Sequence, residues 1–284
     1  MKNIGRLLIL VLVSLVPMAQ QPADSEQIWT DFMTWFRTAP LGGNPVQLYV
    51  AELQKKGIAV QESQRQAATI LRLLAERPES VAIHYDKIYA RPLSGNPEID
   101  GFPGTPSAFL IEATRGLKPA AALDVGMGQG RNALYLAQAG WDVTGFDISE
   151  TGLSVARANA EKKGLHINTV KASYGAFDFG TEKWDLIVLT FAWAPVSDPG
   201  FVRRIQASLR PGGKVVFEHF IRDVDHPYPE VVRALEPGQL KSCFGAFQIE
   251  RYEEIDGIGD WGGSGSRLVR MIVRKWTPIP ERRI

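Results

Sequence analysis

The stretch that decides the fold is AALDVGMGQGRNALYLAQAG, residues Ala121–Gly140. The apolar run Ala121–Val125 predicts a buried strand, and Arg131–Ala139 predicts a helix that ends at Gly140. The turn between them contains three glycines, Gly126, Gly128 and Gly130. Glycine tolerates positive φ and lets a ligand approach the backbone closely, so the pattern predicts a ligand-binding loop between a strand and a helix.

Strands and helices alternate along the rest of the chain. Further strands are predicted at Trp141–Phe146, Ile167–Lys171, Trp184–Thr190 and Lys214–Phe220. This alternation is typical of an α/β fold, a Rossmann-like doubly wound sheet with helices on both faces. Arg210–Gly213 is predicted to form a turn before the last of these strands. Phe247–Glu254 and Leu268–Lys275 have no helix between them and predict an antiparallel hairpin at the edge of the sheet.

The glycine loop is compatible with more than one ligand. A phosphate-binding loop needs a lysine after its last glycine, and Arg131 stands there instead. A dinucleotide-binding loop reads G-x-G-x-x-G, whereas this loop reads G-x-G-x-G and follows Asp124. Asp147 ends the second strand, where a carboxylate can accept hydrogen bonds from both ribose hydroxyls. That feature is common to dinucleotide sites and S-adenosylmethionine (SAM) sites. The alternative is that Asp147 binds no ligand and only stabilises the N-terminus of the next helix through the helix dipole.

Several motifs together resemble a class I SAM-dependent methyltransferase. They are Asp124-x-Gly126-x-Gly128-x-Gly130, Asp147, WDLIVLT and LRPGGKVVFE. The stretch GQGRNALYLAQAGWDVTGFDIS is similar to the small-molecule branch that contains the tellurite-resistance and thiol methyltransferases. The resemblance covers about residues 105–275 and implies a seven-stranded sheet whose last strand is antiparallel.

The resemblance also implies SAM as the cofactor and assigns residues to it. The three loop glycines would lie against its methionine part, Asp124 would hold its ammonium group and Asp147 its ribose. In this family an acid after the third strand often meets the adenine; Ala172 and Ser173 stand there, and Ser173 is the expected substitute. Thr190 would border the methyl group. The implied cofactor-binding residues are Asp124, Gly126, Gly128, Gly130, Asp147, Ile148, Ala172, Ser173 and Thr190.

Candidates for a general base lie after the fifth strand, in EHFIRDVDHPYPE. This stretch places Glu218, His219, Asp223, Asp225 and His226 at a carboxyl strand end. Histidine is suited to proton removal near neutral pH, so His219 and His226 are the candidate catalytic residues. The alternative is a polar surface loop. The spacing matches no metal site, and none is predicted.

Composition limits the partners and cofactors. The 284 residues carry 32 basic and 31 acidic side chains, a net charge of +1, so a nucleic-acid partner is not expected. The single cysteine, Cys243, excludes an intrachain disulfide and a cysteine-based zinc or iron–sulfur centre. The acceptor is expected to be a small molecule, and the sequence leaves the oligomeric state open.

The N-terminal residues indicate where the protein is located rather than how it folds. In residues 1–19, Lys2 and Arg6 precede the apolar run Leu7–Val16, which is the layout of a signal peptide or N-terminal anchor. The run is shorter than the ~20 residues that span a bilayer. Export or membrane association is therefore expected, with a cytoplasmic location if the segment is not a signal. SAM is made in the cytoplasm, which conflicts with export.

The sequence therefore predicts three units along the chain and one main function. Residues 20–104 predict a helical N-terminal extension, with a Gly- and Pro-rich linker at 92–107, and residues 105–284 a SAM-binding methyltransferase domain. In the extension, His84 and Tyr85 are expected to be structural. The predicted function is transfer of the SAM methyl group to a small-molecule nucleophile by in-line displacement. The alternatives are a non-catalytic SAM-fold binding protein and a nicotinamide-dependent oxidoreductase.

Overall fold

The structure is a computed structural model that describes residues 24–39, 44–77, 79–91, 104–222, 235–258 and 265–277. The predicted N-terminal signal or anchor and most of the predicted linker lie outside these ranges. Within these ranges, no helix combines the length and apolar character that a membrane span requires.

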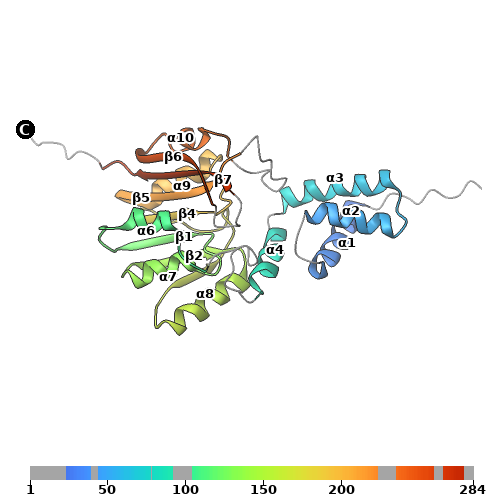
Figure 1. Ribbon diagram of the computed structural model, residues 1–284, viewed down its shortest axis with the longest axis horizontal. Coiled ribbons are helices and arrows are strands. Elements are labelled where there is room, and N and C mark those ends of the chain that lie inside the picture. The colour runs from blue at the N-terminus through green and yellow to red at the C-terminus, as the bar shows by residue number, and fades with distance from the viewer. Residues whose placement is uncertain are drawn as a thin grey trace, which may run out of the picture.

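A seven-stranded sheet forms the centre of the larger part of the molecule (Figure 1). Its strand order is β3-β2-β1-β4-β5-β7-β6. The strands are β1 (Ala121–Val125), β2 (Asp142–Asp147), β3 (Asn168–Lys171), β4 (Trp184–Thr190), β5 (Leu209–Phe220), β6 (Gln248–Ile258) and β7 (Gly265–Arg274). The first five strands pair in parallel, and β7 lies antiparallel between β5 and β6. The predicted doubly wound sheet with an antiparallel last strand is confirmed.

Helices cover both faces of this sheet. They are α6 (Ala108–Thr114), α7 (Arg131–Gln138), α8 (Glu150–Lys162), α9 (Pro199–Ser208) and α10 (Gln239–Cys243). Successive strand residues point to opposite faces, so Ala122 joins the apolar core under α6, α7 and α8, while Leu123 joins the core under α9 and α10. The strand order reverses between β1 and β4, and ligands of such sheets bind at the carboxyl ends of the strands at this reversal.

The predicted turn at Arg210–Gly213 is wrong, because β5 already begins at Leu209. Trp184 pairs with Leu209 and Leu186 pairs with Lys214, so the pairing between β4 and β5 shifts register here. Proline and glycine therefore mark an irregularity within the strand rather than its start.

The described residues of the N-terminal extension form four helices, α1 (Ser25–Thr38), α2 (Pro45–Lys55), α3 (Val60–Glu76) and α4 (Glu79–Tyr89). The first three share an apolar core around Phe32 and Ile70. Helix α4 lies between this core and α8 (Figure 1). On one side, Lys87 Nζ donates to the carbonyl of Phe36 at 2.7 Å, and the His84 ring stacks on the Phe36 ring. His84 is therefore part of the helical packing, and burial lowers its pKa.

Candidate active site

The glycine loop follows β1 and has a backbone that only glycine adopts readily. The φ angles of Gly126, Gly128 and Gly130 are 69°, 52° and 78°. The amides of Gly126 and Met127 donate to the carbonyl of Phe146, at 2.9 and 3.0 Å, and Gly130 N donates to the Met127 carbonyl at 2.8 Å. These N–H groups are already used within the protein and are not free to donate to a phosphate.

Asp147, at the end of β2, is fixed by the backbone around it. Its Oδ2 accepts from Gly128 N at 2.9 Å, and its Oδ1 accepts from Ser149 N at 2.8 Å. Burial raises the pKa of Asp147, and hydrogen bonds from the backbone of Ser149, Gly128 and Ile148 act against this rise. A carboxylate has about four acceptor sites, so Asp147 retains capacity for ligand hydroxyls.

Asp124, on β1, is more deeply buried than Asp147, and one of its carboxylate oxygens lacks a hydrogen bond within the described part of the chain. Its side chain is 2% exposed, and its Oδ2 has no hydrogen-bond partner among the described residues. Burial raises the pKa of Asp124 to about 7, although the positive charge of Arg131 lowers it. A buried acceptor without a partner is costly, and a cationic ligand group would relieve that cost. This orphaned oxygen is the observation that fits the ammonium group of SAM.

Helix α4 reaches the same site from the N-terminal extension. Asp86 Oδ1 accepts from Ser149 Oγ at 2.6 Å and from Thr151 N at 3.0 Å, so it caps the first turn of α8. The Tyr89 ring packs between Gly128 and Gly152, where an added Cβ would come within 2.4 and 2.8 Å of it. Sequence analysis missed both residues. The available signal was their three-residue spacing, which places them on one face of a helix.

The turn after β3 brings Ala172 and Ser173 beside Asp147. Ala172 N donates to the Asp147 carbonyl at 3.0 Å. Ser173 Oγ accepts from Ala176 N at 3.3 Å and so stabilises its own turn. The next residue, Tyr174, places its hydroxyl 3.0 Å from a Cβ built on Gly126. Adenine contact by Ser173 stays a prediction.

The end of β4 is held by buried polar groups. Thr190 Oγ1 accepts from Asn132 Nδ2 at 2.6 Å, a contact that sequence analysis missed. Phe191 adopts a left-handed φ of 51°, and its N–H donates to the Glu218 carbonyl at 2.7 Å. Such a conformation is strained for a non-glycine residue and is characteristic of functional sites. Ordered groups therefore surround the point where the parallel strands end.

Both carboxylate oxygens of Glu218 accept hydrogen bonds within the protein. Its Oε2 accepts from Ser107 Oγ at 2.7 Å, and its Oε1 accepts from Arg270 Nε at 2.7 Å. These bonds tie the start of α6 and strand β7 to β5. Glu218 is thus a structural anchor.

His219 points away from this anchor, since neighbouring strand residues face opposite sides of the sheet. It is 4% exposed, its Nδ1 lies 3.2 Å from the Phe220 carbonyl, and burial lowers its pKa to about 4. The other candidates, Asp223, Asp225 and His226, lie outside the described residues. Among the residues that the structure describes, no group of three or more His, Cys, Asp or Glu side chains is placed to hold a metal ion.

The chain is similar in sequence and fold to known methyltransferases. Residues 122–213 match the model of the methyltransferase domain family. A probable S-adenosyl-L-methionine-dependent methyltransferase of Haemophilus influenzae, TehB, is 29% identical over 150 residues, which cover 51% of this chain and 52% of TehB. The crystal structure of TehB from Haemophilus influenzae superposes with a TM-score of 0.54 and 25% identity, covering 60% of this chain and 62% of that one. Residues 122–213 of the chain therefore form a methyltransferase domain.

The similarity to these known proteins covers only part of each chain. A ubiquinone biosynthesis O-methyltransferase of Coxiella burnetii is 33% identical over 114 residues, which cover 40% of this chain and 49% of that protein. The chain spans about half the length of the curated relatives it matches. The family match implies SAM as the cofactor of the domain, and the resemblance to a SAM-dependent methyltransferase expected from the sequence is confirmed.

Proposed function

We propose that this protein transfers the methyl group of SAM to a small-molecule nucleophile by in-line displacement. The observation that carries the proposal is the unpartnered Oδ2 of Asp124 beside a glycine loop whose amides are already bonded. Such a site suits a cationic, phosphate-free ligand. A nicotinamide dinucleotide would instead need amide donors for its pyrophosphate, and the amides of Gly126, Met127, Gly128 and Gly130 are already bonded within the protein.

The residues around the loop would hold the cofactor. Asp124 would bind the ammonium group, Asp147 the ribose hydroxyls, and the three glycines the methionine part. Ile148, Ala172 and Ser173 would border the nucleoside, and Thr190 the methyl group. When bound, SAM supplies a methyl carbon that its sulfonium already activates.

The main task of the protein is then to align the acceptor. Alignment supplies ~7–11 kcal/mol of the barrier reduction, whereas a general base adds about 10²–10⁴-fold, or roughly 3–5 kcal/mol. Burial holds His219 neutral, with a pKa of about 4, so it is a weak base at neutral pH. A small-molecule acceptor is supported by the name of the Coxiella relative, an O-methyltransferase of ubiquinone biosynthesis.

Calorimetry on the full chain tests this proposal. SAM and its demethylated product, S-adenosylhomocysteine, are expected to bind with one site each, and NAD is expected not to bind. Binding of neither SAM nor its product to folded protein would refute the proposal. Thermal protection by NAD alone would favour the oxidoreductase, and cofactor binding without transfer to any of a panel of acceptors would favour a non-catalytic binding protein.

A further inference from the structure

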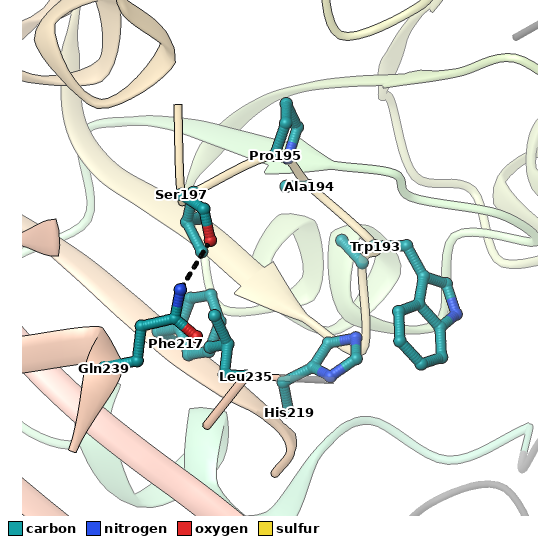
Figure 2. A pocket seen from close by; sticks show the side chains of 10 residues that line it. Trp193, Ala194, Pro195, Ser197, Phe217, His219, Leu235 and Gln239 are labelled. Atoms are coloured by element: carbon teal, nitrogen blue, oxygen red, sulfur yellow. Dashed lines mark hydrogen bonds between the residues drawn. The ribbon is translucent and has the colours of Figure 1, made fainter. Parts of the chain in front are cut away.

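A cavity of about 400 Å³ lies beyond the carboxyl end of β4 (Figure 2). Its wall comes from the segment that follows β4, from β5 and from the start of α10. The lining residues used below are Ala192, Trp193, Ser197, Phe217, His219 and Gln239. The volume is sufficient for a small organic molecule of one or two rings.

The cavity adjoins the glycine loop through Ala192. A Cβ built on Gly126 lies 3.1 Å from the Cβ of Ala192, and Ala192 also lines the cavity. Since Gly126 belongs to the proposed cofactor site, a ligand in the cavity would lie next to that site. This adjacency is what methyl transfer requires of an acceptor site.

Most polar groups of the cavity wall are already paired. Gln239 Nε2 donates to Ser197 Oγ at 3.0 Å, as Figure 2 shows, and Gln239 Oε1 accepts from Glu236 N at 2.9 Å. Among the buried side-chain atoms of the wall, Nε2 of His219 has no partner within the described residues. The Phe220 carbonyl near Nδ1 can only accept, so Nδ1 carries the proton and Nε2 presents a lone pair.

Aromatic and apolar side chains surround this lone pair. Trp193 stands edge-on to the His219 ring with 4.4 Å between ring centroids, and Phe217 lies 6.3 Å away. Among the described lining residues there is no aspartate, glutamate, lysine or arginine. The lining therefore suits an uncharged flat molecule, and Trp193 would turn to let such a molecule reach Nε2.

We propose that this cavity is the acceptor site and takes a neutral, planar, hydroxylated ring whose O–H donates to Nε2 of His219. This inference rests on the proposed methyltransferase function. The acceptor oxygen forms a bond to the methyl carbon, while the carbon–sulfur bond breaks and leaves its electron pair on sulfur. The sulfonium becomes a neutral thioether. The hydroxyl proton passes along its hydrogen bond to Nε2 of His219, and the imidazole then releases it to solvent.

Three matched probes test the site on the full chain saturated with S-adenosylhomocysteine. They are 2-naphthol, its methyl ether, which lacks the donor, and 2-naphthoate, which carries a charge. Calorimetry is expected to show naphthol binding about tenfold more tightly than the ether, with naphthoate weaker still, since one hydrogen bond and one unpaired charge separate them. Equal binding of naphthol and ether, or tighter binding of naphthoate, would overturn the proposal.

Variants then assign the effect to one residue. His219→Leu is expected to weaken naphthol about tenfold, to leave the ether nearly unchanged, and to preserve S-adenosylhomocysteine binding. His166→Leu, at an exposed histidine before β3, is the matched control. Unchanged naphthol binding in His219→Leu contradicts the proposal, and if that variant does not fold, the naphthol–ether comparison on the wild-type chain decides.

The two proposals can fail separately. If S-adenosylhomocysteine binds and 2-naphthol does not, the acceptor assignment is wrong and the methyltransferase proposal stands. If the naphthol pattern appears without any binding of the cofactor product, the cavity is a ligand site and the methyltransferase proposal is wrong.

Discussion

Asp124 and Asp147 lie near the ends of two neighbouring parallel strands, and both are buried, yet their surroundings differ. Asp147 accepts backbone hydrogen bonds on both carboxylate oxygens, from Gly128 and from Ser149, and the backbone of Ile148 also bonds to it. Asp124 receives a backbone bond from Ala133, and its other oxygen has no partner among the described residues. The protein therefore fixes one carboxylate and leaves the other incomplete.

This difference assigns the two carboxylates to different ligand groups. A fixed, partly satisfied carboxylate suits neutral hydroxyl groups, because their orientation matters more than their charge. An incomplete carboxylate with a pKa raised to about 7 gains most from a cation, since the cation stabilises the charged form that burial disfavours. Each prediction below alters one side of this comparison.

The largest effect is expected from Asp147→Ala. The substitution removes the acceptor proposed for two ribose hydroxyls and frees the amides of Gly128 and Ser149. Hydrogen bonds to charged groups contribute about 1.5–3 kcal/mol each, so affinity for S-adenosylhomocysteine is expected to fall about 100-fold. Calorimetry measures the loss, and Asp142→Ala, at the exposed start of the same strand, is the control. Unchanged affinity in folded Asp147→Ala would remove this residue from the proposed site.

Asp124→Asn is expected to have a smaller effect that depends on pH. Below pH 7 the wild-type carboxyl is largely protonated, so cofactor affinity should rise with pH through about 7, and binding should release a proton. In the asparagine variant this proton release is lost, and affinity above pH 8 is expected to be about tenfold weaker. Calorimetry in buffers of different ionisation enthalpy measures the released protons.

The raised pKa of Asp124 also predicts that the free energy of unfolding falls as pH rises, whereas cofactor affinity rises with pH. A folded-state pKa raised to about 7 means that the folded chain holds a proton that the unfolded chain loses near pH 4. The contribution of Asp124 to the free energy of unfolding is therefore complete below about pH 4 and is lost as pH rises to about 7. Denaturant unfolding of the ligand-free wild type and Asp124→Asn measures this, and identical pH dependences would contradict the assigned pKa.

The fold was predictable from the sequence, and the ligand site stays a prediction. Strand–helix alternation predicted the sheet, and the glycine spacing with Asp124 and Asp147 predicted where a ligand would approach, because these features are local. The different states of the two carboxylates were not predictable. They depend on which backbone amides the fold brings to each oxygen, and on how deeply each one is buried.

Long-range packing explains what the sequence did not reveal. Asp86 and Tyr89 belong to the N-terminal extension, and their importance depends on docking of α4 against α8 and the glycine loop. The neutrality of His219 is likewise a result of burial, since a histidine beside a carboxyl strand end would otherwise titrate near pH 6.5. The irregularity at Arg210–Gly213 was mistaken for a turn because proline and glycine mark both features.

The smallest effect is expected from Asp86→Ala, which acts only on the Asp147 side of the comparison. The substitution removes the cap that Asp86 provides to Thr151 N and Ser149 Oγ, at a cost of about 1 kcal/mol. It also removes a negative charge that raises the pKa of Asp147. These two changes oppose each other, so cofactor affinity should change by about threefold or less.

Hydrogen exchange in the first turn of α8 should nevertheless become faster in Asp86→Ala, because one of its amide bonds is lost. Asp31→Ala, on an exposed face of α1, is the control. The proton release assigned to Asp124 should stay nearly the same, since the charges that shift the pKa of Asp124 are those of Arg131 and Asp147, and Asp86 acts on it only through Asp147. If proton release changed together with exchange in α8, the two carboxylates would titrate as one coupled system, and their separate assignments to hydroxyl and ammonium groups would not hold.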